Sequence, residues 1–221
     1  MVQPQRVPTA SSLRDSFDAL VTQDGTNAHP YVQSGKLVKG RDATRNLADA
    51  VHFVSILHGS VPGLIGHAAL VAIDGDEREW FAAASDGFAR ERAYLSRLGA
   101  AVGPMPSTVG QQACEQTVVA QAHAVATLGG SERAGCALGG ALALAIDWRS
   151  IRAVLDSAAA RFDVTPPALA LPDLVPTARL IDARSGSGTE RAMLFGAQQL
   201  LAQHRGLWDL LASRELARSA T

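Results

Sequence analysis

Five side chains of types that bind metal ions lie on stretches where apolar residues recur with helical spacing: Asp49, His52, His67, Glu91 and Glu115. Asp49 and His52 are three residues apart, which places them on one face of a helix. A carboxylate-x-x-His step of this kind is typical of helical bundles that hold two iron or two manganese ions. The five residues are therefore candidate metal ligands or acid–base groups, with iron or manganese as the candidate cofactor.

The same side chains also have a purely structural interpretation. Burying a charge without a partner costs several kcal/mol, so such groups pair with one another, become neutral or bind a metal. A second carboxylate-x-x-His step, which would complete a two-metal ligand set, is missing from the sequence. The main interpretation is that these polar residues form hydrogen bonds and ion pairs in the core, and a metal site is the alternative.

Three more polar residues fall on predicted apolar faces. His58 lies close in sequence to the candidates above, and His204 interrupts the apolar stripe of the last helix. Asp147 shares its helix face with Leu144 and Ile151, so we expect it near the core boundary with a hydrogen-bond partner.

A short turn at residues 59–62 separates two predicted helices. The first is capped by Asp42 and runs to about His58, and the second runs from the turn to about Ile73. Short connections make antiparallel neighbours, so His52 and His67 should lie at one level along a hairpin. The pattern leaves open whether the two imidazoles converge.

These side chains are positioned by a helical bundle that we expect to be organised around residues 134–162. This stretch begins with a long uncharged Ala/Leu-rich run and continues as a stripe at steps of three and four: Leu144, Trp148, Ile151 and Leu155. The uncharged run is too short to span a bilayer, which takes about 20 apolar residues. The sequence therefore predicts an all-α, single-domain multi-helix bundle with this helix at its centre.

Composition supports the same fold class. About 40 of the 221 residues are alanine and only 5% are aromatic, which favours helices that approach closely. Alternating β-branched runs are missing, so we expect helices over most of 43–162 and 189–215 and no sheet. The predicted organisation is a flexible arm at 1–11, one domain over 12–216 with a Pro-rich connection at 163–188, and a tail at 217–221.

Charge and targeting features exclude several classes of partner. The formal net charge is −1 with only two lysines, so no basic nucleic-acid-binding face is expected. No secretory signal and no membrane span are recognisable, and we therefore expect a cytoplasmic protein. The two cysteines, Cys114 and Cys136, are expected to be buried free thiols.

Three phrases carry a resemblance to known proteins: HFVSILHGSVPGLIGHAA, ERAYLSRLGAAVGPMPS and GCALGGALALAIDWRSIRAVLDSAAARF. Together they resemble an uncharacterised bacterial helical protein family over about 45–162, and this resemblance implies no activity. In the layout of its helices the chain is also similar to ferritin-like and heme-oxygenase-like (TenA-type) domains. Layout alone does not fix function.

The sequence leaves the function unknown, and whether the protein is an enzyme stays open. Besides the structural interpretation we keep two alternatives: a metal-binding or small-molecule-binding helical-bundle enzyme, and a scaffold or interaction module. The scaffold would make contacts through residues 163–188 or 23–41. Assembly into a homo-oligomer is one form of this alternative.

Overall fold

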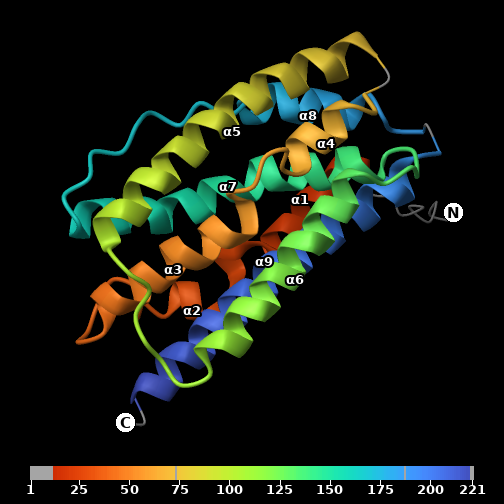
Figure 1. Ribbon diagram of the computed structural model, residues 1–221. Coiled ribbons are helices and arrows are strands. Elements are labelled where there is room, and N and C mark those ends of the chain that lie inside the picture. Colours follow the sequence, from red (N-terminus) through yellow and green to blue (C-terminus); the bar gives the residue numbers. More distant parts are fainter. Residues whose placement is uncertain (1–11, 73, 187, 220–221) are drawn as a thin grey trace, which may run out of the picture.

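The computed structural model describes residues 12–219 except 73 and 187, and within them every regular element is a helix (Figure 1). The prediction of an all-α fold is therefore confirmed. The elements are α1 (Leu13–Asp24), the 3₁₀ turn η1 (Thr26–Ala28), α2 (Pro30–Gln33), α3 (Ala43–His58), α4 (Leu64–Ala69), α5 (Gly75–Val102), α6 (Gln111–Gly129), α7 (Cys136–Arg161), α8 (Leu174–Asp182) and α9 (Glu190–Ser219).

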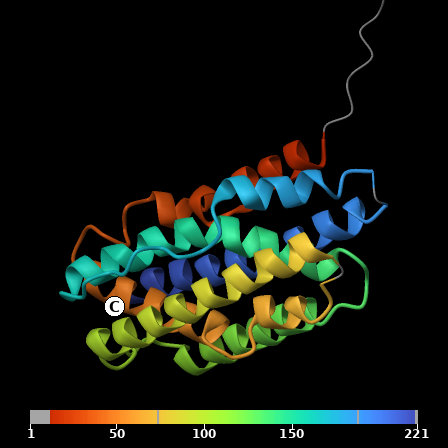
Figure 2. The same ribbon diagram turned by 90° about the horizontal axis from the view of Figure 1, so that it is seen from above.

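Helix α7 lies at the centre of the bundle, as the sequence predicts. It packs against α1, α3, α4, α5, α6 and α9. Figure 2 shows α1 and α8 on one side of α7 and α3, α5 and α6 on the other. Its uncharged first part, 136–145, is completely buried, and so is the predicted stripe of Leu144, Trp148, Ile151 and Leu155.

Glycines allow α7 and α9 to approach with their backbones almost in contact. A Cβ atom at Gly139 would lie 2.0 Å from the carbonyl oxygen of Met193, and one at Gly196 would lie 2.0 Å from that of Cys136. Neither position has room for any side chain. The close approach brings the buried faces of α7 and α9 together. Asp147 of α7 and His204 of α9 meet between them.

The predicted hairpin around residues 59–62 is wrong. Helix α4 ends at Ala69 rather than near Ile73, which itself lies outside the described residues, and it packs on α5, α6 and α7 instead of pairing with α3. Helical periodicity specifies the apolar face of each segment, but it does not say which neighbour covers that face.

Two further segments are folded against the bundle. Within residues 23–41, which the scaffold alternative offers as a contact surface, His29 and Tyr31 are each only 5% exposed, because η1 and α2 pack against α9. The predicted tail at 217–221 is helical as far as Ser219, and Arg218 in it is buried. Ser12 caps α1, and its hydroxyl accepts a hydrogen bond from the Asp15 N–H.

Candidate functional site

The structure does not gather the five candidate ligands into one site. Among residues 12–72, 74–186 and 188–219, no group of three His, Cys, Asp or Glu side chains is arranged to hold a metal ion. Each of the candidates has other neighbours, and two of them belong to buried ion-pair networks.

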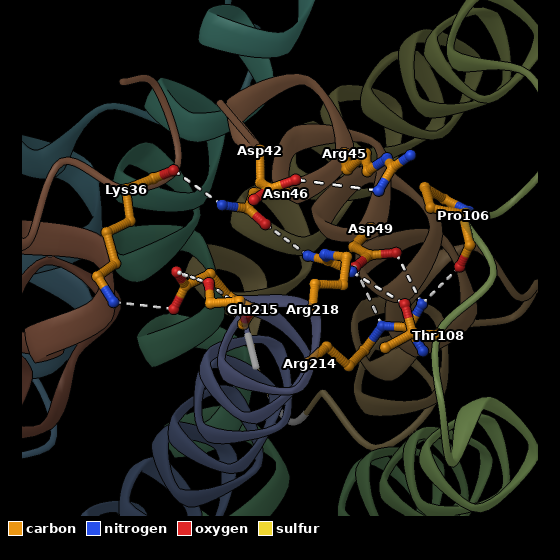
Figure 3. A network of polar contacts seen from close by, with 11 residues as sticks. Lys36, Asp42, Arg45, Asn46, Asp49, Pro106, Thr108, Arg214, Glu215 and Arg218 are labelled. Carbon is orange, nitrogen blue, oxygen red and sulfur yellow. Dashed lines mark hydrogen bonds and ion pairs between the residues drawn. The ribbon is translucent and has the colours of Figure 1, made fainter. Parts of the chain in front are cut away.

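Asp49 lies at the centre of one such network, between α3 and the C-terminal end of α9 (Figure 3). Its carboxylate accepts hydrogen bonds from Arg214 Nε (3.0 Å) and Nη2 (2.9 Å) and from Arg218 Nη1 (2.5 Å). The Arg218 guanidinium also donates to Asn46 Oδ1. Asp49 is 1% exposed and is already paired with two guanidinium groups, whose positive charges oppose the binding of a metal cation there.

Glu91 lies in a second network, between α5 and α7. Its carboxylate accepts hydrogen bonds from Trp148 Nε1 at 2.9 Å and from Arg152 Nη1 at 2.7 Å. Burial raises the pKa of the Glu91 carboxyl above its usual value, although both donors act in the opposite direction. Arg152 also donates to the Pro167 carbonyl oxygen, so this network fastens the Pro-rich connection to α7.

The remaining three candidates face separate neighbours. His52 Nε2 donates to the carbonyl oxygen of Gly103, just after α5, over 2.9 Å. His67 packs against Gly129, the last residue of α6, and Glu115 accepts a hydrogen bond from Gln111 on its own helix. The C-terminal end of α5 and the C-terminal end of α6 lie at opposite ends of the bundle (Figures 1 and 2). This placement gives no support to a metal shared by His52 and His67.

A different set of polar residues forms a continuous chain through the core. His204 Nδ1 of α9 lies 2.6 Å from Asp147 Oδ2 of α7, and His204 Nε2 lies 2.9 Å from Nε2 of His58, the last residue of α3. His204 is 0% exposed, Asp147 1% and His58 6%. We call the chain His58–His204–Asp147 the relay. The predicted hydrogen-bond partner of Asp147 is thus confirmed, although Asp147 is fully buried rather than at the boundary.

Donors from η1 hold the Asp147 carboxylate in place. Thr26 donates its N–H to Asp147 Oδ1 (2.8 Å) and its hydroxyl to Oδ2 (2.7 Å), and the same hydroxyl accepts from Trp208 Nε1. Burial by itself pushes the pKa of Asp147 up, but the hydrogen bonds from His204 and Thr26 outweigh it, and the pKa is lowered. The carboxylate is therefore ionised and requires a donor, Nδ1–H, from His204.

One proton occupies the space between the two imidazole rings. If His204 is neutral, His58 Nε2–H donates to it; if His204 is protonated, it donates to His58, whose proton is then on Nδ1. Burial, followed by the charge of His204, lowers the pKa of His58 far below its ordinary value. A positive charge is therefore disfavoured on His58, whereas on His204 it would lie beside the Asp147 carboxylate.

The His58 end of the relay borders a small cavity, which is also lined by Ser60, Gly63, Phe88 and Arg92. It leaves about 10 Å³ for the centre of a water-sized sphere, which is close to the room one water molecule needs. Among the described residues we find no hydrogen bond to His58 Nδ1, and no hydrogen bond or ion pair of the Arg92 guanidinium. We call this space the His58 cavity.

The sequence indicates three of the residues in this site, but it does not indicate that they lie together. His58, His204 and Asp147 all stand out as polar residues on apolar stripes, yet they lie on three helices and share no short motif. Thr26 and Arg92 carry no signal in the sequence, because threonines in turns and arginines on helices are ordinary.

One family model, described as a family of unknown function (DUF6975), matches residues 21–219. Comparison with curated proteins and with solved structures found no match. The likeness of layout to ferritin-like and heme-oxygenase-like domains therefore has no support beyond the helical fold. None of the helices in the described part of the chain is long and apolar enough to cross a membrane.

Proposed function

Because the chain belongs to this family of unknown function (DUF6975), we propose its function from the geometry of the site: the protein binds a small molecule at the His58 cavity and exchanges a proton with it through the relay. The observation that carries the proposal is the unbroken line of hydrogen bonds from Asp147 through His204 to His58, at 2.6 and 2.9 Å, which ends at the cavity.

The relay has the parts of a general base. A proton taken up on His58 Nδ1 makes that ring cationic, and the proton on His58 Nε2 then moves to His204 Nε2. The net result is a neutral His58 and an imidazolium on His204, which donates to the Asp147 carboxylate over 2.6 Å. Because the charge comes to rest beside a fixed anion, a buried histidine can act as a base at neutral pH.

The packing around the relay holds its side chains in a fixed geometry. The His58 ring packs edge-on against Trp148 at a centroid distance of 5.4 Å and against His204 at 5.0 Å. Three helices and η1 supply the groups, so no rotation of a single side chain preserves the chain of hydrogen bonds. Such restraint is what an acid–base group requires and what a solvated histidine lacks.

A pH titration of the histidine ¹⁵N resonances by NMR tests this proposal. In the wild type the rings of His58 and His204 should respond together, because they share one proton. In His204→Gln the His58 ring should stay neutral through the same range, since it has lost the ring that takes up the charge.

His123 is exposed on α6 and serves as the internal control, with the same titration in both proteins. If His58 titrates independently in the wild type, or equally in His204→Gln, the relay does not move a proton.

A second candidate function is self-association through the α6–α9 face. Helix α6 has no lysine or arginine and one acid over 19 residues, which is unusual for a helix in contact with water. Helix α6 exposes Val119 (44%), and Phe195 of α9 (43%) lines a hollow of about 350 Å³ beside this helix.

Sedimentation tests the self-association. The wild type should be a dimer that Val119→Glu dissociates and that Leu174→Glu on α8 leaves intact. A monomeric wild type would exclude this second function.

A further inference from the structure

Within the part of the chain that the structure describes, Arg92 is a cation without an anion. It lies on α5, half-buried, and lines the His58 cavity. The other arginines buried between helices have carboxylate partners: Arg152 lies 2.7 Å from Glu91, and Arg214 lies 2.9 Å from Asp49. Among the described residues, no carboxylate lies within ion-pair distance of the Arg92 guanidinium.

The surroundings of Arg92 make this lack of a partner unfavourable. Burial lowers the pKa of the Arg92 guanidinium, and no other influence offsets it. Because Arg92 is only partly exposed, water compensates its charge only in part, so an anion bound at the cavity would restore what burial has removed.

The enclosed space takes one oxygen-sized group, so only one end of the bound small molecule enters it. The cavity has room for about one water molecule. Arg92 Nη1 lies 4.0 Å from the position that a Cβ atom would take at Gly63, which places the guanidinium over the start of α4. His58 borders the same space from the end of α3 and Ser60 from the turn that follows it.

We infer that the ligand of the His58 cavity is an oxyanion, a carboxylate or phosphate group, which pairs with Arg92 and directs one oxygen toward His58. The inference rests on the proposed small-molecule site and names the chemical class that the site accepts. A guanidinium matches both groups, since its parallel N–H donors fit two oxygens of either one. The imidazole then faces the bound group at the position where a proton can be exchanged.

Thermal unfolding at constant ionic strength tests the inference with four probes: acetate, inorganic phosphate, acetamide as the neutral analogue of acetate, and sodium chloride. The wild type should show a saturable rise in melting temperature with acetate, with phosphate or with both, because a ligand that binds only the folded state stabilises it by mass action. Acetamide and chloride should give none. The two oxyanions together show whether the site takes the planar or the tetrahedral group.

Two arginine variants on the same helix separate the site from general electrostatics. Arg92→Gln should weaken oxyanion binding about tenfold or more, the usual effect of losing a charge-assisted hydrogen bond. Arg90→Gln removes the same charge from an exposed position on α5 and should bind as the wild type does. Equal binding by Arg92→Gln and wild type, or no saturable rise in the wild type, overturns the inference.

The NMR titration of the relay is made without added anion, so the two proposals fail separately. A shared titration of His58 and His204 without oxyanion binding leaves the acid–base site and refutes its ligand class. Oxyanion binding through Arg92 without a shared titration refutes the proton exchange and leaves an anion-binding pocket.

Discussion

Two buried polar networks fasten α9 to the rest of the bundle, and they differ in whether their cations can lose their charge. The Asp49 network pairs one carboxylate with two guanidinium groups, which stay charged at every accessible pH. The relay pairs the Asp147 carboxylate with an imidazole that is itself bonded to a second imidazole. The first network is a fixed connection between α3 and α9, whereas the second is the one to which we assign proton exchange.

The surroundings of the two networks differ in the same sense. The Asp49 network is surrounded by further polar groups of the chain, from Asn46 to Thr108 and the Pro106 carbonyl oxygen (Figure 3). The relay is surrounded by Trp148 and Trp208 and ends at a cavity beside a cation. Burial alone therefore does not distinguish the two networks, but the position of His58 at the edge of a cavity does.

The largest expected effect comes from removing the anion of the fixed network. Asp49→Ala leaves two guanidinium groups buried without a carboxylate, and should lower the free energy of unfolding by about 3–5 kcal/mol. Chemical denaturation measures this, with Asp86→Ala on the exposed side of α5 as the control, for which a change within about 0.5 kcal/mol is expected. A loss of similar size in both variants would mean that the ion pairs contribute nothing specific.

A smaller loss is expected when the anion of the relay is neutralised. Asp147→Asn keeps the shape but weakens the bonds from Thr26 and His204, and should cost about 1.5–3 kcal/mol, the range for hydrogen bonds to a charged group. It should also remove the shared titration of His58 and His204, because a neutral amide no longer holds the imidazolium. A variant that loses stability but keeps that titration would show that Asp147 is a purely structural residue.

The pH dependence of stability provides a third way to separate the networks. In the unfolded chain His58 and His204 each bind a proton below about pH 6.5, whereas in the folded protein the lowered pKa of His58 limits the pair to one proton. The unfolded state therefore binds more protons, and stability should fall with acidification below about pH 6.5, by up to about 1.4 kcal/mol per pH unit.

His58→Gln should flatten this slope, because its side chain does not titrate. Denaturation curves at several pH values between about 5 and 7 for both proteins measure the difference. Arg214→Lys in the fixed network is the matched control and should leave the slope as it is in the wild type, even if stability falls. An equally steep slope in His58→Gln would assign the acid sensitivity to other groups.

The smallest expected effect concerns the metal hypothesis. Because Asp49 and Glu91 are held by arginines, while His52 and His67 contact different ends of the bundle, Mn²⁺ or Fe²⁺ should not raise the melting temperature of the purified protein. A rise that depends on metal concentration and is absent in the double variant His52→Ala, His67→Ala would restore that hypothesis.

Much of the fold could be predicted because helical periodicity is a local property of the chain. The spacing of Leu144, Trp148, Ile151 and Leu155 marks the buried side of α7 whatever surrounds it, and long α5 follows from the same rule. The predicted pairing of α3 with α4 was wrong, because a short turn brings two helices side by side only when their apolar faces meet. The apolar face of α4 is covered by α5, α6 and α7.

The sequence by itself determined that the polar residues on apolar stripes need partners, since the cost of burying them unpaired does not depend on the fold. Only the tertiary structure decided which partners they have. Asp147 meets a histidine 57 positions later in the chain, and that histidine meets another 146 positions earlier. A helical wheel fixes the direction in which a side chain leaves its own helix, but the helix that faces it is chosen by the packing of the whole bundle.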